Sequence, residues 1–310
     1  MALTAHKLQY VDFDGVVIDG VQSLGLDPNI AAVVAGGSGA PYNTHAGTRR
    51  TVPSLSAMTT DLKSFLDKVG LVGKAITTGD VLTTYWSLVA EGGQPNSAGS
   101  VHEKIVINKG VIYPEMLSVD EDTDASLSFS ALATHDGTNL PVVFTASQAL
   151  PATESDVDVL WGLGPITILG SQVEGIQGYT INFGNLARTR GSDGRPYAYH
   201  SSIDLHQPTI EIRVLDPRVM RTFTLLGTAQ VTTPSALYLR KRALGGGPVA
   251  NATAEHIKFT ITKGVIVPGP ARADHPADVV GTLTIHPVYT PSGTVLPIVL
   301  DTVSIIPVGL

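Results

Sequence analysis

Apolar and polar residues alternate along most of this chain, in short runs separated by glycine, proline, serine and threonine. A period of two is typical of β-strands with one buried face, because successive side chains point to opposite sides. The clearest runs are HEKIVINKGVIYP at 102–114 and EHIKFTITKGVIVP at 255–268, each containing a Lys-Gly pair. A glycine inside a strand pattern predicts a bulge or a tight bend, here at Gly110 and Gly264. The pattern predicts a mainly β protein.

Two further alternating stretches predict hairpins. Residues 125–144 contain the turn dipeptide Asp136-Gly137 between two apolar runs, and residues 281–300 contain Ser292-Gly293 in the same setting. Asp-Gly between alternating residues is a strong hairpin signal. Many short antiparallel strands pack most naturally as a sandwich or a partly rolled barrel.

One segment near residue 65 has the period of a helix instead. Asp61 or Thr60 can cap its start, and Gly70 can end it. Its apolar residues recur at the spacing of one helical face: Leu62, Phe65, Leu66 and Val69. We expect a short α-helix at about 61–69.

A second helix is expected at about 217–226. There Asp216 can cap the start, Pro217 occupies the first helical position, and Gly227 can end the segment. Two different sequences thus carry the same start and stop signals.

The chain also repeats itself. A shift of 155 residues aligns IDGVQSLGLD (18–27) with VEGIQGYTIN (173–182), and GAPYNTH (39–45) with GRPYAYH (194–200). After small loop changes, IVINKGVIYP (105–114) aligns with FTITKGVIVP (259–268). This order of matches predicts a tandem duplication with copies at 8–148 and 163–304. The expected domains are two homologous β units at 1–148 and 163–310, joined by a linker at 149–162.

The stretch YVDFDGVVIDG at 10–20 resembles the nucleophile loop of haloacid-dehalogenase phosphatases, in which Asp12 would attack phosphorus and Asp14 would handle the proton. The second copy has Thr167 and Leu169 at these positions, so the carboxylates are not shared. No parallel βα array follows. We interpret the two aspartates as the polar face of a strand.

Other candidate chemistry is equally weak. His45 and His200 share a PYxxH pattern, but no nucleophile or acidic partner recurs beside them, so we interpret them as loop anchors or subunit contacts. His200, Asp204 and His206 fit no zinc spacing, and the acidic run 119–124 lacks the glycine and late glutamate of an EF-hand. We expect no catalytic site, no metal and no cofactor.

Composition narrows the class of protein. Hydrophobic residues make up 43% of the chain and charged residues 15%, which is typical of a folded protein. There is no cysteine, which excludes disulfides and thiolate metal sites. The net charge of −7 argues against a protein that grips nucleic acid by its phosphates. No secretory pattern or membrane-length apolar run is apparent, so we expect a soluble protein without a membrane partner.

Taken together, these features resemble phage major tail proteins. The resemblance rests on the duplicated β units and on the helix that follows PSLSAMTTDL (53–62) in one copy and PTIEIRVLD (208–216) in the other. It rests also on the KGVI strands and on the DGTNLP and SGTVLP segments. The resemblance covers nearly the whole chain and is one of architecture. It implies a tail tube subunit, in which each β-sandwich adds strands to a ring. Most such tubes stack hexameric rings, and those with a duplicated domain stack trimers that mimic hexamers.

The resemblance implies particular partners and surfaces. Partners would be other copies of the chain, the tape-measure, tail-terminator and distal-tail proteins, and DNA that passes without specific binding. The location would be the virion, after assembly in the host cytoplasm. The expected inter-subunit residues lie in two long loops: Tyr42, His45, Arg49, Arg50, Arg188, Arg190, Tyr197 and His200. The candidate acids of the lumen are Asp12, Asp14 and Asp19.

Three alternatives stay open, of which a phosphatase of the haloacid-dehalogenase type, with Asp12 as the nucleophile, is the least favoured. Another virion component, such as a baseplate, neck or decoration protein, could use the same duplicated unit. A tandem carbohydrate-binding module is the second, although aromatic residues make up only 6% of the chain, and neither Trp86 nor Trp161 has a tryptophan at the matching position of the other copy.

Overall fold

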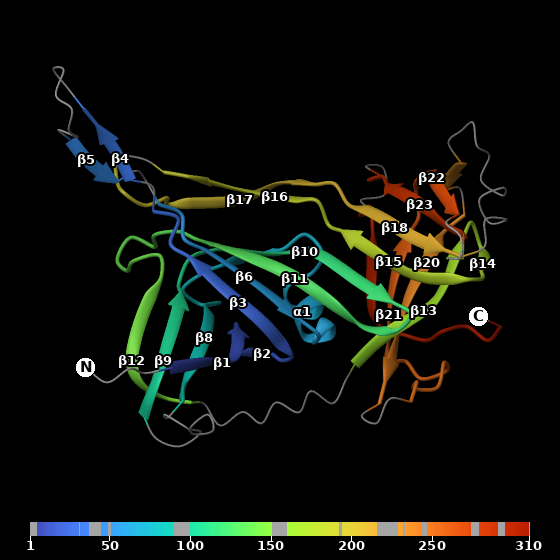
Figure 1. Ribbon diagram of the computed structural model, residues 1–310, viewed down its shortest axis with the longest axis horizontal. Helices are drawn as coiled ribbons and strands as arrows, with labels where there is room; N and C mark the ends of the chain where they lie inside the picture. The colour runs from blue at the N-terminus through green and yellow to red at the C-terminus, as the bar shows by residue number, and fades with distance from the viewer. Residues whose placement is uncertain are drawn as a thin grey trace.

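The computed structural model describes residues 5–30, 32–36, 45–48, 51–89, 100–150, 160–191, 194–215, 229–231, 233–243, 247–273, 279–290 and 295–309. Within these ranges lie 24 strands and one α-helix (Figure 1). The predicted mainly β class is confirmed.

The elements of the N-terminal half are β1 (Ala5–Phe13), β2 (Val16–Ile18), β3 (Val21–Asp27), β4 (Ala32–Ala35), β5 (His45–Thr48), β6 (Ser54–Thr59), α1 (Leu62–Val69), β7 (Lys74–Ile76), β8 (Leu82–Val89), β9 (Ser100–Ile107), β10 (Gly110–Asp120), β11 (Thr123–Ala133) and β12 (Val143–Ala149). Those of the C-terminal half are β13 (Leu160–Ile168), β14 (Ser171–Val173), β15 (Ile176–Asn182), β16 (Asn185–Arg190), β17 (His200–His206), β18 (Thr209–Val214), β19 (Ala229–Val231), β20 (Ser235–Arg242), β21 (His256–Ile261), β22 (Gly264–Ala273), β23 (Val279–Pro287) and β24 (Val299–Ser304).

The two halves repeat one pattern of strand pairing. Each has a five-stranded antiparallel sheet, in the order β12-β9-β8-β1-β2 in the first half and β24-β21-β20-β13-β14 in the second. Each also contributes one series to the large sheet, β3-β6-β11-β10-β7 and β15-β18-β23-β22-β19. Two small hairpins, β4–β5 and β16–β17, also match in position. Twelve strands therefore follow the same plan twice.

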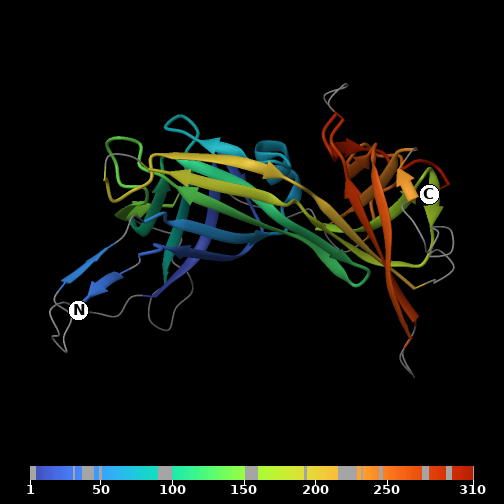
Figure 2. The ribbon, with the colours of Figure 1, turned by 90° about the horizontal axis from the view of Figure 1, so that it is seen from above.

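The large sheet runs through both halves. Strand β10 pairs with β15, and this joins the two series into a ten-stranded sheet (Figure 2). Most of the buried apolar side chains form one cluster, which includes Phe13 and Phe129 from the first half and Trp161 and Phe259 from the second. Pairing satisfies backbone groups that an open edge would leave free.

The two predicted hairpins are wrong. Strand β11 pairs with β10 and β6 in the large sheet, whereas β12 pairs with β9 in the five-stranded sheet. Residues 134–142 therefore connect two layers. Asp136 shapes this loop by accepting hydrogen bonds from the backbone N–H groups of Thr138 and Asn139, at 2.7 and 2.6 Å. Strands β23 and β24 are likewise in different sheets, and Ser292-Gly293 lies outside the described residues.

The Lys-Gly pair does mark a tight bend, as predicted. The chain passes from β9 in one layer to β10 in the other across Asn108 and Lys109. Gly110 has a φ of 157°, and a Cβ atom there would lie 2.0 Å from the carbonyl oxygen of Leu132. Only glycine allows this close approach.

Helix α1 confirms the first helix prediction. Asp61 caps it by accepting a hydrogen bond from the backbone N–H of Ser64 at 3.2 Å, and Gly70 ends it with a φ of 74°. Its apolar face is buried against the large sheet, where the rings of Phe65 and Phe129 lie 4.7 Å apart. The second predicted helix lies in residues 216–228, outside the described residues.

The two halves meet between β12 and β13. Strand β12 ends at Ala149, and β13 begins at Leu160, within the predicted linker of 149–162. Trp161 on β13 is 1% exposed and belongs to the core. Residues 151–159 lie outside the described residues.

Candidate assembly interface

The strongest candidate for a functional surface is the join between the two halves. Met116–Asp120 of β10 pair in antiparallel register with Gly178–Asn182 of β15. Leu117 lies opposite Ile181, and the side chains of both residues are fully buried. The join is thus both a backbone ladder and part of the hydrophobic core.

Buried Tyr179 fixes the same join from the C-terminal side. It lies opposite Val119, and its hydroxyl donates to the carbonyl oxygen of Tyr238 at 3.3 Å. Burial raises the pKa of Tyr179 well above its usual value, so the phenol stays neutral and keeps this donor.

The strands of the join approach closely at Gly178. A Cβ atom at this position would lie 2.5 Å from the carbonyl oxygen of Val119 and 2.3 Å from a carboxylate oxygen of Asp120. Asp120 also forms an ion pair with Arg213 of β18. Both charged side chains are more than a third exposed, so this pair contributes geometry more than stability.

Hairpin β16–β17 of the C-terminal half lies along the N-terminal half (Figure 1). At its base the side-chain amide of Asn185 donates to the carbonyl oxygens of Leu71 and Pro114, at 3.0 and 2.9 Å. The amide oxygen of Asn185 lies 2.7 Å from Nδ1 of His206, which therefore carries the proton. Burial lowers the pKa of His206, so the imidazole is held neutral.

The far end of this hairpin binds the N-terminal half through backbone and aromatic contacts. Thr51 donates its N–H to the carbonyl oxygen of Pro196, and His135 donates its N–H to that of Ala198, both at 2.8 Å. The ring of His135 lies 5.9 Å from that of Tyr197 and 4.9 Å from that of Tyr199. The N-terminal half therefore has a binding surface, which we call the seat, that receives a hairpin from the C-terminal half.

The same join leaves two unlike edges of the large sheet without a partner among the described strands. At one end, β3 pairs only with β6. At the other end, β19 covers only Gly264–Ile266 of β22, and no described strand flanks the rest of β22 on that side. By the repeated pattern, β3 is the counterpart of β15, and β22 is the counterpart of β10. The two edges without a partner, those of β3 and β22, are therefore of the same kinds as the edges of β15 and β10 that pair within the chain.

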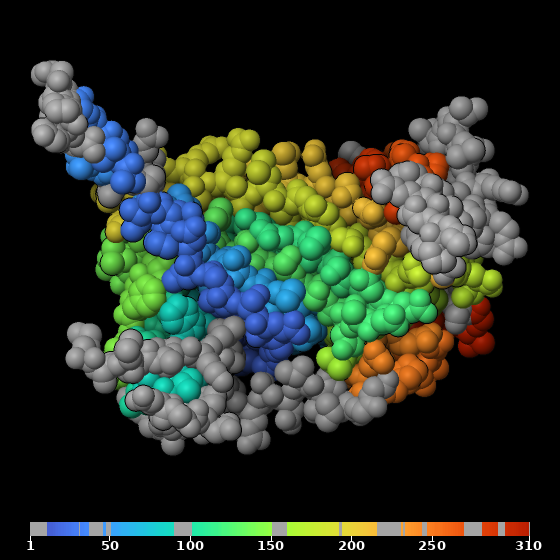
Figure 3. Space-filling view, in the orientation of Figure 1, coloured from blue at the N-terminus to red at the C-terminus, as the bar shows by residue number. Residues whose placement is uncertain are grey.

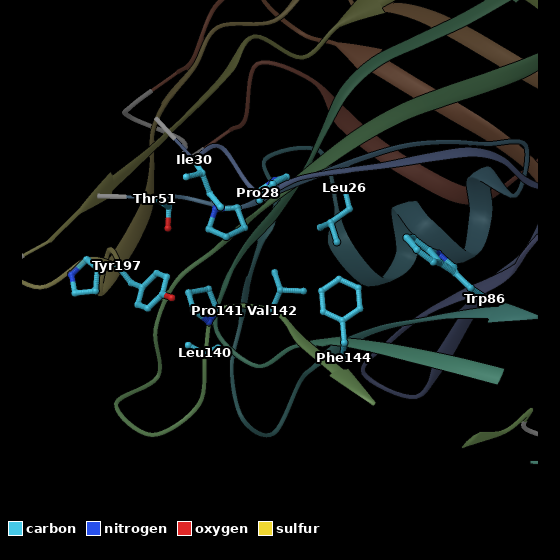
Figure 4. Close-up of a pocket in the computed structure, with 12 residues that line it drawn as sticks. Leu26, Pro28, Ile30, Thr51, Trp86, Leu140, Pro141, Val142, Phe144 and Tyr197 are labelled. Atoms are coloured by element: carbon cyan, nitrogen blue, oxygen red, sulfur yellow. The ribbon is translucent and has the colours of Figure 1, made fainter. Parts of the chain in front are cut away.

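An apolar pocket of about 560 Å³ lies beside the free β3 edge (Figure 4). It is lined by Leu26, Pro28, Ile30, Thr51, Pro53, Trp86, Leu140, Pro141, Val142, Phe144, Pro196 and Tyr197. Ile30, Leu140 and Phe144 are each more than half exposed. In the other half, Phe183 stands at the position of Pro28 and is fully buried. Apolar surface is thus left open beside the free β3 edge.

The open face of the large sheet is rich in hydroxyl groups. Its strands from the N-terminal half lie uncovered in the middle of Figure 3. Side chains that alternate with the buried ones include Ser54, Ser56, Ser118, Ser126, Ser128, Thr180, Thr282 and Thr284. The hydroxyls of Ser118 and Ser126 lie 3.2 Å apart across two strands. The same face also has the charged residues Asp120, Glu211 and Arg213, and Arg213 forms an ion pair with Asp120.

The expected inter-subunit residues fall into three groups. Tyr42, Arg49 and Arg50 lie outside the described residues. His45 begins β5. The other four belong to hairpin β16–β17 or to the loop at its tip: Arg188, Arg190, Tyr197 and His200. Arg188 forms an ion pair with Asp204 of the same hairpin at 3.4 Å. Tyr197 makes its contacts with the N-terminal half of its own chain.

Asp12 and Asp14 lie at the end of β1 and in the turn that follows it, in the five-stranded sheet rather than in the large sheet. Asp12 accepts a hydrogen bond from the N–H of Gly15 at 3.1 Å, within the turn between β1 and β2. Asp14 forms ion pairs with Lys68 and Lys74, and its hydrogen bond with Lys68 lowers its pKa to about 2. The N–H of Asp19 donates to a carboxylate oxygen of Asp61 at 3.3 Å. The contacts of Asp12 and Asp14 are those of a turn and its supporting ion pairs.

Among the described residues, no group of three or more histidine, aspartate or glutamate side chains is arranged to hold a metal ion. The candidate set His200, Asp204 and His206 is distributed along β17. His206 uses Nδ1 to bond Asn185, and Asp204 bonds Arg188 and Ser202.

The sequence reasoning missed a pair of buried histidines. His102 on β9 and His256 on β21 are both fully buried and lie in the two five-stranded sheets. Lys104 and Lys258, two residues further along, each lie 5.7 Å from the ring centroid of a tyrosine, Tyr85 and Tyr238. The repeat could have revealed this pair, because His102 and Lys104 align with His256 and Lys258 in the register that matches the two KGVI segments.

Comparison with protein-family models and with curated proteins found no match. No helix within the described ranges has both the length and the apolar character needed to cross a membrane.

Proposed function

We propose that this chain is a structural protein of a virion that assembles with copies of itself into closed rings, and that stacked rings form a tail tube through which DNA passes. The observation that carries this proposal is the join of β10 with β15, which unites unlike edges and leaves the same two kinds of edge free. A heterologous contact of this kind generates rings when the rotation closes.

In this proposal β22 of one chain pairs with β3 of the next, as β10 pairs with β15 within the chain. Three chains would then give a ring with six similar units, which agrees with the resemblance to tube proteins that have a duplicated domain. Each new join would cover the free β3 edge and the apolar pocket beside it. Covering such an edge removes a site of uncontrolled aggregation.

We place the channel on the open face of the large sheet. Its serine and threonine side chains offer a polar surface without a dense positive charge, so DNA could pass without being held by its phosphates. Asp12 and Asp14 would not line this channel, because they lie in β1 and in the turn after it, which belong to the five-stranded sheet. The net charge of −7 still opposes adhesion of DNA to the whole ring.

The partners of such a tube would be the tape-measure, tail-terminator and distal-tail proteins, and assembly would take place in the host cytoplasm. A baseplate, neck or decoration protein with the same unit would also form a ring but would not stack into long tubes. Light scattering and negative-stain imaging of the purified protein separate these cases. Rings together with hollow tubes would support the assignment as a tail tube subunit, and rings alone would favour another virion component.

The register within the chain defines a sharper test. Hydrogen bonds from Phe183 N to Glu115 O and from Glu121 N to Gln177 O place Ser118 and Thr180 in a non-hydrogen-bonded pair. In such a pair the Cα atoms lie about 4.5 Å apart, within the range that a disulfide spans. The matching residues of the free edges are Arg272 on β22 and Gly25 on β3.

The double variant Gly25→Cys with Arg272→Cys should therefore form disulfides between chains under mild oxidation, in a chain that has no other cysteine. Gly25→Cys with Val267→Cys is the matched control, because Val267 matches Tyr113, which lies outside the β10–β15 register. Closed trimers from the first pair and monomers from the second support the proposal. A protein that stays monomeric when concentrated and forms no such disulfide would overturn it.

A further inference from the structure

The C-terminal half contains a counterpart of the seat that receives hairpin β16–β17, and no hairpin among the described residues occupies it. In the N-terminal half this seat includes Ile76, Lys109, Gly110 and His135, and residues 196–203 of the hairpin lie over it. His200 and Ser201 of the hairpin line one cavity together with Ile76, Lys109, Gly110 and Asp136.

The matching residues of the C-terminal half follow from backbone contacts. The N–H of Thr134 donates to Lys109 O in one half, and the N–H of Val288 donates to Lys263 O in the other. Tyr289 therefore stands where His135 stands. Strand β19 pairs with the start of β22 through Val231 and Gly264, as β7 pairs with β10 through Ile76 and Gly110.

At these matching positions the described residues leave an open apolar hollow. A cavity of about 540 Å³ is lined by Val231, Thr262, Lys263, Gly264, Val265, Val288, Thr290 and Val295. Val288 is 42% exposed and Tyr289 is 45% exposed, whereas His135, the counterpart of Tyr289, contacts a hairpin. Exposed apolar side chains gathered in this way mark an interaction surface.

One hairpin of the chain matches the missing occupant. Hairpin β4–β5 has the same place in the N-terminal half that β16–β17 has in the C-terminal half, and Figure 1 shows it projecting away from the body at the end opposite β22 and β23. Ala35 pairs with His45 and Ala32 with Thr48, so both limbs of this hairpin are formed in the free chain. Its β5 limb, His45–Thr48, aligns with His200–Ile203.

We propose that hairpin β4–β5 of one chain docks on the Val231–Lys263–Val288–Tyr289 seat of the adjacent chain. This inference rests on the proposed ring, because the β22–β3 join brings the hairpin of one chain beside the seat of the next. The partner is a second copy of the chain, since the seat repeats the one that binds a hairpin of related sequence. The hairpin acts as a clamp that adds a contact outside the large sheet.

The test uses cysteine pairs and a short bis-maleimide linker. Ser201→Cys with Asp136→Cys reports the occupied seat within one chain, because both residues line the same cavity. Ala46→Cys with Thr290→Cys is the matching pair for the seat of the C-terminal half. We expect the first pair to be linked within a chain and the second between chains, seen as dimers and trimers on a denaturing gel.

A substitution in the seat completes the experiment. Val288→Asp should lower the yield of the Ala46–Thr290 link by about tenfold, because docking would bury an unpaired carboxylate. Val303→Asp is the matched control, since Val303 is an exposed valine of β24 outside the seat, and it should leave the yield unchanged.

The outcomes separate the two proposals. If the Gly25–Arg272 disulfide forms but the Ala46–Thr290 link does not, the hairpin inference is overturned and the ring stands. If neither forms, both fail. An Ala46–Thr290 link that is insensitive to Val288→Asp would also overturn the seat, because the link would then arise from a contact elsewhere.

Discussion

His102 and His256 make the same hydrogen bond in the two halves of the chain. Nδ1 of His102 accepts from the backbone N–H of Leu88 at 3.0 Å, and Nδ1 of His256 accepts from that of Lys241 at 3.1 Å. Each histidine is fully buried and ties its own strand to the neighbouring one. The two units therefore share an internal polar contact as well as a strand order.

Removing this acceptor should destabilise the fold. We expect His256→Ala to lower the free energy of unfolding by roughly 1–3 kcal/mol, because a buried N–H loses its partner. Nε2 of His256 also lies 3.1 Å from the carbonyl oxygen of Ala250, whereas Nε2 of His102 has no partner among the described residues. His102→Ala removes one hydrogen bond fewer, so it should lower the free energy of unfolding by less than His256→Ala. Urea unfolding measures both values. His256→Asn is the control, because its side-chain oxygen can accept in place of Nδ1, and equal losses for Ala and Asn would contradict this role.

Gly178 should be the most sensitive position of the join. A valine there would place its Cβ within 2.5 Å of Val119 O, so Gly178→Val should separate β15 from β10. Hydrogen exchange should become faster at the amides of residues 116–120 and 178–182, while the two five-stranded sheets keep their protection. Thr180→Val is the matched control on the same strand. Unchanged exchange at the join in Gly178→Val would show that the strands can move apart without unpairing.

The base of hairpin β16–β17 should respond to acid. Burial lowers the pKa of His206 below its ordinary value of 6.5, so the unfolded chain binds the proton more strongly than the folded one. The associated stability is complete above pH 6.5 and is lost as the pH falls from 6.5 through the lowered folded-state pKa. Urea midpoints over this range should therefore fall in the native chain and fall less in His206→Gln. His200→Gln, at an exposed histidine of the same strand, should behave as the native chain.

The stability of the loop between β11 and β12 should also depend on pH, in a more acidic range. Hydrogen bonds from the side chain of Asn139 and from the N–H groups of Thr138 and Asn139 lower the pKa of Asp136 from 3.8 to about 2. The lowered pKa stabilises the loop above pH 3.8, and this contribution is lost as the pH falls through about 2. In an NMR titration, Asn139→Ala should raise the pKa of Asp136 toward 3.8. An unchanged value would mean that the backbone donors suffice.

The strand segments and the first helix were accessible from the sequence, because local patterns mark them and the repeat shows many of them twice. The apolar stripe of α1 and its cap at Asp61 follow local rules, and they were predicted correctly. The bend at Gly110 was visible as a glycine within a strand pattern, and its match at Gly264 strengthened the interpretation.

The shared sheet could not be predicted in this way. Met116–Asp120 alternate like any half-buried strand, and nothing in their side chains distinguishes an edge from an interior strand. The pairing with β15 is made by backbone groups, which every sequence has. The predicted hairpins were wrong for a related reason. A strand, an Asp-Gly dipeptide and a strand also describe a loop that connects two layers, as the loop with Asp136 does.

The join of β10 with β15 also bears on how the size of an assembly would be set. Because it unites unlike edges, every added chain exposes the same two edges again, and the contact itself sets no limit to growth. Only the rotation from one half to the next determines after how many units the sheet meets its own beginning. That rotation is already present within a single chain. A substitution that alters the packing between the halves, away from either free edge, would therefore change the number of chains in the closed ring before it changed their affinity.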